Sequence, residues 1–128
     1  MYKIYIGVLF TFLIYLSGCD SGNPGIHISA EEFVTLAEQP NTVILDVRTD
    51  AEYNNGHLKN AVLINLHAPD FTERIRNLDK SKTYYVYCQS GGRSTSAVRK
   101  MRAEGIAKAY NIRGGIYQLA RQGAQFVE

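Results

Sequence analysis

The sequence has little cysteine, almost no net charge and no tryptophan. Only two cysteines stand among its 128 residues, far below the density of disulfide-stabilised scaffolds, so a disulfide framework is excluded. The 14 Lys and Arg side chains nearly balance the 12 Asp and Glu, and a net charge of +2 is too small for a nucleic acid-binding surface. The length excludes a multidomain chain, because domains usually need about 100 to 150 residues each. The sequence therefore predicts one small domain that does not bind nucleic acid.

The first 18 residues form the most apolar part of the chain. They include 13 apolar side chains, and the run from Ile4 to Leu16 carries no charge. As a helix this run would extend roughly 20 Å, whereas a membrane-spanning helix needs about 20 residues. A run of this length is typical of the apolar core of a signal peptide. We predict that residues 1–18 are a signal peptide.

The segment Leu16-Ser17-Gly18-Cys19 follows directly. It resembles the lipobox of bacterial lipoproteins, in which the chain is cut before the cysteine and a lipid is attached to the cysteine sulfur. The resemblance implies lipidation at Cys19, a tether over residues 19–25 and a domain over 26–128 that is held at the bacterial cell envelope and faces the periplasm or the exterior. An ordinary signal peptide or an uncleaved anchor, with an incidental Cys19, is the alternative. The choice between inner and outer membrane stays open.

From Ile26 onward, short apolar runs alternate with amphipathic segments. The predicted strands are 43–47, 61–64, 83–87 and 109–112, and the predicted helices are 29–40, 51–53, 71–78, 94–104 and 116–119. Strands that alternate with helices predict a parallel sheet with helices on both faces. In such a sheet, ligands bind beyond the carboxyl ends of the strands. Cys88 directly follows the strand over 83–87, so it stands at that edge.

The loop after Cys88 is suited to a reactive thiolate. Gly91 and Gly92 can adopt backbone angles that turn successive N–H groups inward into an anion-binding nest. The helix that begins near Ser94 adds the positive end of its dipole, and Arg93 adds a formal charge. All three effects favour the thiolate over the thiol. Cys88 is therefore predicted to be a nucleophile.

The sequence of this loop, Cys88-Gln89-Ser90-Gly91-Gly92-Arg93-Ser94, resembles the active-site loop of single-domain rhodaneses. The upstream signature of that family is similar to Asp46-Val47-Arg48, Glu52-Tyr53, Gly56-His57-Leu58 and Ala61, and Gly114-Gly115 matches its late glycine pair. The similarity extends from about Ile26 to Gln122. It implies an α/β fold with a small, mostly parallel five-stranded sheet and helices on both faces. Leu119 stands where many members of the family have tryptophan.

The resemblance also implies a function. Cys88 would attack the outer sulfur of a donor such as thiosulfate, hold it as a persulfide and pass it to a thiol or to cyanide. The implied anion-binding loop is Gln89, Ser90, Gly91, Gly92, Arg93 and Ser94. Asp46, Arg48, Glu52 and His57 are expected to support it through salt bridges and hydrogen bonds, not as a general base. No cofactor and no metal are implied.

The same loop is compatible with other functions. Phosphatases of the same fold, related to the cell-cycle type, have five residues between Cys and Arg, whereas four separate Cys88 from Arg93 here. The shorter loop favours sulfur over a tetrahedral phosphate. A sulfur carrier without useful turnover, or an envelope thiol-redox protein, stays open as an alternative, although no resolving cysteine accompanies Cys88 if Cys19 is lipidated.

Charge is unevenly distributed along the chain. Residues 19–87 contain six basic and ten acidic side chains, whereas residues 88–121 contain seven basic and one acidic. This distribution would draw a small dianion towards the segment with the nucleophile. Arg99, Lys100 and Arg102 are instead expected on a solvated helix face. His27 and His67 lack metal-ligand partners at suitable spacing and are expected on the surface.

Overall fold

A computed structural model describes residues 25–128 of the chain. The predicted signal peptide, the lipobox with Cys19 and nearly all of the predicted tether lie outside the described residues. Within the described part, no helix is both long enough and apolar enough to cross a membrane.

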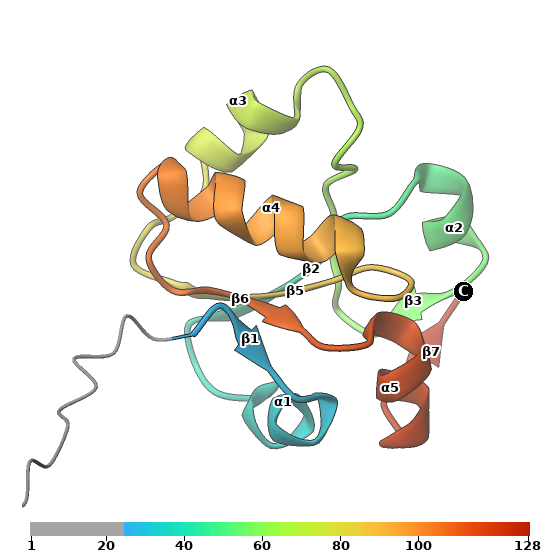
Figure 1. Cartoon of the computed structure of the whole chain (residues 1–128). Coiled ribbons are helices and arrows are strands. Elements are labelled where there is room, and N and C mark those ends of the chain that lie inside the picture. The colour runs from blue at the N-terminus through green and yellow to red at the C-terminus, as the bar shows by residue number, and fades with distance from the viewer. Residues whose placement is uncertain (1–24) are drawn as a thin grey trace, which may run out of the picture.

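A five-stranded sheet forms the centre of the domain (Figure 1). Its spatial order is β1-β6-β5-β2-β4, and all neighbouring strands are parallel. The strands are β1 (His27–Ile28), β2 (Thr42–Asp46), β4 (Val62–Leu63), β5 (Thr83–Tyr87) and β6 (Ala109–Ile112). The predicted α/β fold with a mostly parallel five-stranded sheet is thus confirmed.

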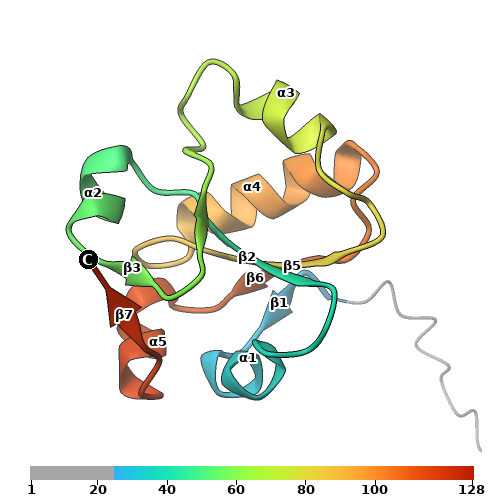
Figure 2. The ribbon, with the colours of Figure 1, turned by 180° about the vertical axis from the view of Figure 1, so that it is seen from behind.

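Helices cover both faces of this sheet, as Figures 1 and 2 show from opposite sides. The helices α3 (Phe71–Arg76) and α4 (Gly92–Ala103) lie on one face, and α1 (Ala30–Leu36) and α5 (Gly115–Arg121) lie on the other. The short helix α2 (Asp50–Asn54) stands beyond the end of β2. Each face has its own cluster of buried apolar side chains.

The central strand β5 supplies both clusters, because successive side chains of a strand point to opposite faces. Tyr84, Val86 and Cys88 are buried in the cluster beneath α3 and α4. Tyr85 and Tyr87 are buried in the cluster beneath α1 and α5. This alternation sends the Cys88 side chain to the face that α4 covers, at the carboxyl end of the sheet.

The ends of the helices differ from the predictions by a few residues. The helix predicted over 94–104 begins at Gly92, since Gly91 takes a left-handed conformation with φ of 112° and starts the helix earlier. The helix expected to reach residue 40 ends at Leu36. The helical turn predicted at 51–53 is a complete helix with a capping box, in which the Thr49 and Glu52 side chains each bond the other's backbone N–H.

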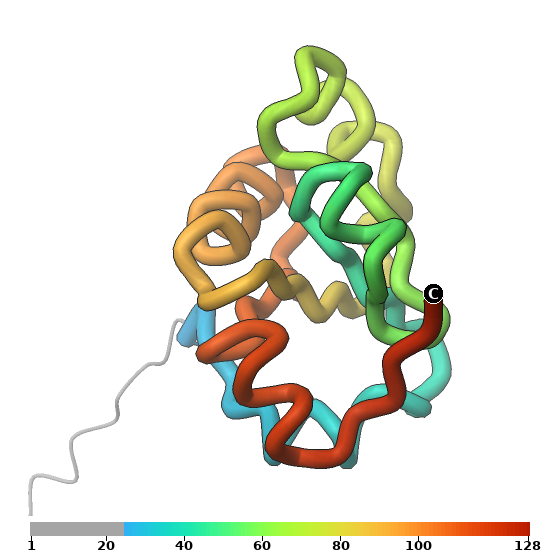
Figure 3. The backbone as a smooth tube through the Cα atoms, turned by 90° about the vertical axis from the view of Figure 1, so that its right-hand side faces the viewer, coloured from blue at the N-terminus to red at the C-terminus, as the bar shows by residue number. Residues whose placement is uncertain are grey.

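A second, two-stranded sheet is not predicted by the pattern of the sequence. In it, β3 (His57–Leu58) pairs antiparallel with β7 (Phe126–Val127), and Figure 3 shows the C-terminal end of the chain beside this green segment. Two-residue strands are too short to show a periodic pattern, which is also why β1 was missed. The pairing attaches the C-terminus to the segment that follows α2.

Candidate active site

Cys88 lies buried where β5 ends, with only 1% of its surface exposed. Its Sγ accepts hydrogen bonds from the backbone N–H groups of Gly91 at 3.1 Å and Ser94 at 3.4 Å, and the Ser94 Oγ lies 3.3 Å away. Burial by itself raises the pKa of Cys88, but the bonds from the Ser94 hydroxyl and from the N–H groups of Ser94, Gly91 and Ser90 together lower it below its usual value. The loop therefore stabilises a buried thiolate.

The late glycine pair fits closely against this loop. The N–H of Ile116 donates to the carbonyl oxygens of both Cys88 and Gln89, each at 3.1 Å. A Cβ on Gly115 would stand only 2.4 Å from the Cys88 carbonyl oxygen. The glycine thus lets the start of α5 hold the loop from the side opposite α4.

The sequence predicts that Arg93 adds its charge to the anion-binding loop, but in the structure its guanidinium is paired with Glu52. Its Nη1 and Nη2 each bond one carboxylate oxygen of Glu52 at 2.8 Å. Glu52 also accepts from the N–H and the hydroxyl of Thr49. Hydrogen bonding to Arg93 lowers the pKa of Glu52 strongly, and burial opposes this only in part. Arg93 therefore joins the start of α4 to α2 through an ion pair.

Removal of the Glu52 charge should reduce stability in a pH-dependent way. The carboxylate, with a pKa lower in the folded than in the unfolded chain, stabilises the fold above its unfolded pKa of about 4.3, and this contribution is lost as the pH falls through the lowered folded pKa. We expect Glu52→Gln to lower the unfolding free energy by about 1 kcal/mol at neutral pH, since the pair is partly exposed. The deficit should shrink below a pH of about 4. Urea denaturation at both pH values measures it, with the exposed Glu38→Gln as control, and a deficit that stays constant with pH would contradict the assignment.

Asp46 and Arg48 form a buried pair beside the site. Arg48 Nε and Nη2 bond the Asp46 carboxylate at 3.0 and 2.7 Å, and Nη2 also donates to the carbonyl oxygen of Gly56. The Tyr87 hydroxyl donates to Asp46 at 2.7 Å and accepts from the N–H of Leu58. Burial and the Asp46 carboxylate raise the pKa of Tyr87. These contacts tie β2, β5 and β3 together beside the Cys88 loop.

The remaining predicted residues surround the loop or support α2. The His57 ring stacks on Tyr53, with centroids 3.6 Å apart, and its Nδ1 bonds the Tyr53 carbonyl oxygen. Gln89 donates from its Nε2 to the hydroxyl of Tyr117, which is 60% exposed. Ser90 and Gly92 are exposed on the outer side of the loop. His57 thus contributes to the scaffold, whereas Gln89 and Tyr117 form part of the outer rim.

Two residues at the site were not predicted from the sequence. Asn111, on β6, accepts a hydrogen bond from the Ser94 hydroxyl at 2.5 Å, and its Nδ2 lies 2.9 Å from the Nδ1 of His27. His27, expected on the surface, is half-buried, because β1 pairs with β6 so that His27 and Asn111 are register partners. A polar residue within the apolar run 109–112 was the only signal in the sequence.

Comparison of the sequence with known protein families identifies the domain. The family model of the rhodanese-like domain matches residues 29–122, which include the Cys88 loop and the late glycine pair. The chain belongs to the rhodanese family. The sequence motifs that resemble this family thus lie within a rhodanese-like domain, as predicted.

Solved structures of other rhodanese-family proteins have the same fold. A rhodanese-related protein from Thermoplasma volcanium is 26% identical and aligns with a TM-score of 0.71 over 80% of this chain and 98% of its own. A rhodanese-like domain protein from Staphylococcus aureus is 30% identical, with a TM-score of 0.68 over 79% of this chain and 97% of its own.

Curated relatives of this rhodanese domain are longer proteins. The tRNA uridine(34) hydroxylase of Cytophaga hutchinsonii is 34% identical over 107 residues, which are 80% of this chain and 34% of the relative. The protein of the same name from Escherichia coli is 30% identical over 112 residues, 83% of this chain and 31% of the relative. The chain thus spans about a third of the length of these relatives.

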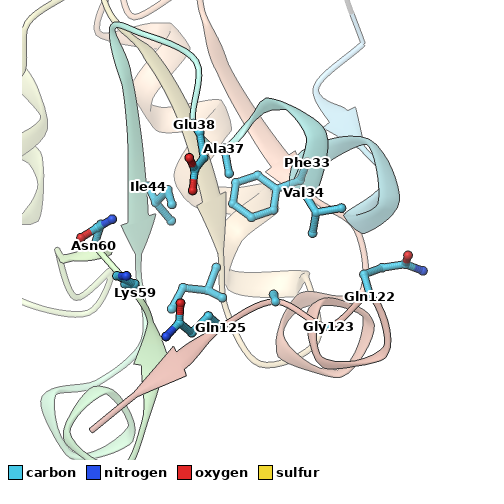
Figure 4. Close-up of a pocket in the computed structure, with 12 residues that line it drawn as sticks. Phe33, Val34, Ala37, Glu38, Ile44, Lys59, Asn60, Gln122, Gly123 and Gln125 are labelled. Carbon is cyan, nitrogen blue, oxygen red and sulfur yellow. The ribbon is translucent and has the colours of Figure 1, made fainter.

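A cavity of about 490 Å³ lies apart from the Cys88 loop in this rhodanese domain, on the face covered by α1 (Figure 4). Phe33 and Val34 of α1 line one side together with Ala37 just after it, and Gly123 and Gln125 line another. Cys88 is not among its lining residues. Among residues 25–128, no three His, Cys, Asp or Glu side chains gather closely enough to hold a metal ion.

Proposed function

We propose that the chain is a sulfurtransferase that carries a sulfane sulfur on Cys88. The observation that carries this proposal is the cradle of backbone N–H groups and the Ser94 hydroxyl around the buried Sγ. A thiolate held by donors is a nucleophile without the help of a general base. The same donors suit a negatively charged persulfide, because they are already directed at the sulfur and need no rearrangement when the persulfide forms.

The reaction consists of two displacements at sulfur. The Cys88 thiolate attacks the outer sulfur of thiosulfate, a new S–S bond forms, and the old S–S bond breaks as sulfite leaves with its electron pair. Cyanide or a thiolate acceptor then attacks the outer sulfur of the persulfide, and the Cys88 thiolate leaves. The first step leaves a persulfide anion on Cys88 and the second restores the thiolate, and each transfers one sulfur atom with its charge balanced, so no external oxidant or reductant is needed.

The direct test is the mass of the full chain after incubation with thiosulfate. We expect the wild-type chain to gain one sulfur atom and to lose it again on addition of cyanide. Cys88→Ser is expected to gain none, because an alkoxide is not available at neutral pH and a serine cannot form a persulfide. A wild-type chain that gains no sulfur, or a serine variant that gains it equally, would refute the proposal.

A sulfur carrier is the second candidate. The observation in its favour is that the curated relatives contain a matching region as only about a third of a longer protein, as is usual for a module that acts with a partner. A carrier would form the persulfide on Cys88 and pass it to one partner, with little turnover on cyanide. The mass measurement therefore tests the persulfide, and the rate of thiocyanate release separates enzyme from carrier.

We further propose that a lipid on Cys19 holds the domain at the bacterial cell envelope. The support is the lipobox resemblance of residues 16–19 and the apolar run before it. In that compartment a single unpaired thiol is exposed to oxidants and to disulfide exchange. Burial of Cys88 to 1% exposure would limit the access of bulky disulfides to its sulfur.

A further inference from the structure

A continuous row of polar atoms leads away from the Cys88 sulfur through the interior. Sγ lies 3.3 Å from Ser94 Oγ, Ser94 Oγ lies 2.5 Å from Asn111 Oδ1, and Asn111 Nδ2 lies 2.9 Å from His27 Nδ1. These residues come from the end of β5, the first turn of α4, and the paired strands β6 and β1 (Figure 1). Four separate parts of the chain thus converge on one hydrogen-bonded row.

The middle of the row is shielded from water. Ser94 is 0% exposed and Asn111 2% exposed, whereas His27 is only half-buried. A buried amide must use both of its ends, and Asn111 has one end on Ser94 and the other on His27. The direction of one hydrogen bond in the row therefore limits the direction of the next.

The thiol form of Cys88 requires one direction. In the arrangement of the structure, the Ser94 hydroxyl donates to Asn111 Oδ1, and Asn111 Nδ2 donates to His27 Nδ1. The single proton of the Ser94 hydroxyl is then used, so the S–H of Cys88 has to donate to Ser94 Oγ. His27 accepts at Nδ1 in this state and carries no proton there.

The thiolate form requires the opposite direction. A thiolate has no proton to donate, so the Ser94 hydroxyl stabilises it only by donating to Sγ. Asn111 must then donate to Ser94 through Nδ2, which a half-turn of the amide accomplishes, and its Oδ1 faces His27. The row is complete only if His27 Nδ1 carries a proton and donates it. Imidazole is the side chain that can accept at this nitrogen in one state and donate in the other.

We propose that His27 is a positioning residue for the thiolate, which acts through Asn111 and Ser94 so that a proton on its Nδ1 directs the Ser94 hydroxyl onto the Cys88 sulfur. The proposal rests on the proposed role of Cys88 as the nucleophile. It assigns a function to the otherwise unexplained burial of a serine and an amide behind the loop, and to the half-buried imidazole that contacts them. The cradle of backbone N–H groups is fixed, whereas this row is the part of the site that can respond to the charge on sulfur.

The charges around His27 determine which of its forms takes part. Burial, Arg113 after β6 and Arg99 of α4 all lower the pKa of His27. The neutral ring therefore predominates at neutral pH, and the donor at Nδ1 is supplied by a change of tautomer. Arg93, which is near enough to interact with Cys88, is held by Glu52. As the pH falls, protonation of His27 adds a second way to supply the donor and opposes loss of the thiolate.

The rate at which iodoacetamide alkylates Cys88 tests this in the full chain, with the modified peptide quantified by mass between pH 5 and 9. We expect His27→Phe to react about tenfold more slowly than the wild type at a pH below the Cys88 pKa, because a pKa one unit higher leaves about tenfold less thiolate. His27→Asn should react within about twofold of the wild type, since an amide can donate or accept near the Nδ1 position. His67→Phe, at an exposed histidine, is the control and should match the wild type.

A second measurement does not depend on a substituted His27. Ring nitrogen chemical shifts report which nitrogen of a neutral histidine carries the proton. In the wild type, with Cys88 as thiolate, we expect the proton of His27 on Nδ1; in Cys88→Ser, which stays uncharged, we expect it on Nε2. The same tautomer in both proteins would overturn the proposal, as would equal alkylation of His27→Phe and wild type. Neither measurement uses thiosulfate, so a failure of sulfur transfer would refute the proposed function without changing this result.

Discussion

Cys88→Ser is expected to lower the rate of thiocyanate formation from thiosulfate and cyanide by about a thousandfold or more. Serine preserves the size of the side chain and its position in the cradle, so the loop should stay folded. Its hydroxyl is not ionised at neutral pH, and its oxygen does not form a stable bond to sulfur. The wild-type rate should fall at acidic pH as the thiolate is protonated, at a pH below the usual thiol range because the loop lowers the pKa of Cys88.

The other cysteine of the chain provides the matched control. Cys19→Ser removes the proposed lipid attachment site, which lies outside the described residues, and it should leave thiocyanate formation unchanged while releasing the protein from the membrane fraction. If Cys19→Ser reduced turnover as much as Cys88→Ser, the assignment of Cys88 as the sulfur carrier would be untenable. If the wild type gained a sulfur atom but released almost no thiocyanate, the carrier function would replace the enzyme.

The overall fold could be predicted because its signals are local. The strands over 83–87 and 109–112 have the predicted boundaries, since each is an apolar run between turn residues. Helix α4 begins two residues before its predicted start. Gly91 and Gly92 can both adopt backbone angles outside the helical region, and the sequence does not say which of them does so. The second sheet was missed because its two strands are short and lie far apart in the sequence.

The sequence predicts the residues of the Cys88 loop, but it does not predict the contacts that this loop makes with distant parts of the chain. Cys88 and the residues that follow it are contiguous, so one segment of sequence contains the nucleophile and its backbone donors. Arg93 was expected to present its charge to an anion, but only the fold reveals that Glu52 binds both of its terminal nitrogens. His27 and Asn111 are 84 positions apart, and the parallel pairing of β1 with β6 brings them together. Contacts of this kind depend on register, which no local pattern records.

Asp46→Ala is expected to lower the unfolding free energy by about 3 to 5 kcal/mol, because it leaves the Arg48 guanidinium buried without its counter-charge. Asp46 is 0% exposed and Arg48 3% exposed, so water cannot replace the lost carboxylate. The Tyr87 hydroxyl would lose its acceptor as well. A loss of this size is a large part of the stability of a small domain, which is about 5 to 15 kcal/mol. Urea denaturation of the full chain at neutral pH measures it.

A second variant separates the charge from the packing. Asp70→Ala removes an exposed carboxylate at the start of α3 that makes no side-chain cap, and it should change stability by less than about 0.5 kcal/mol. The double variant Asp46→Leu with Arg48→Met removes both charges and keeps apolar volume, so it should recover part of the loss. A double variant as unstable as Asp46→Ala would mean that the hydrogen bonds to Tyr87 and Gly56, rather than the unpaired charge, hold this side of the site. Thiosulfate-dependent sulfur uptake should return with stability, because Asp46 and Arg48 orient the scaffold and do not touch the reacting sulfur.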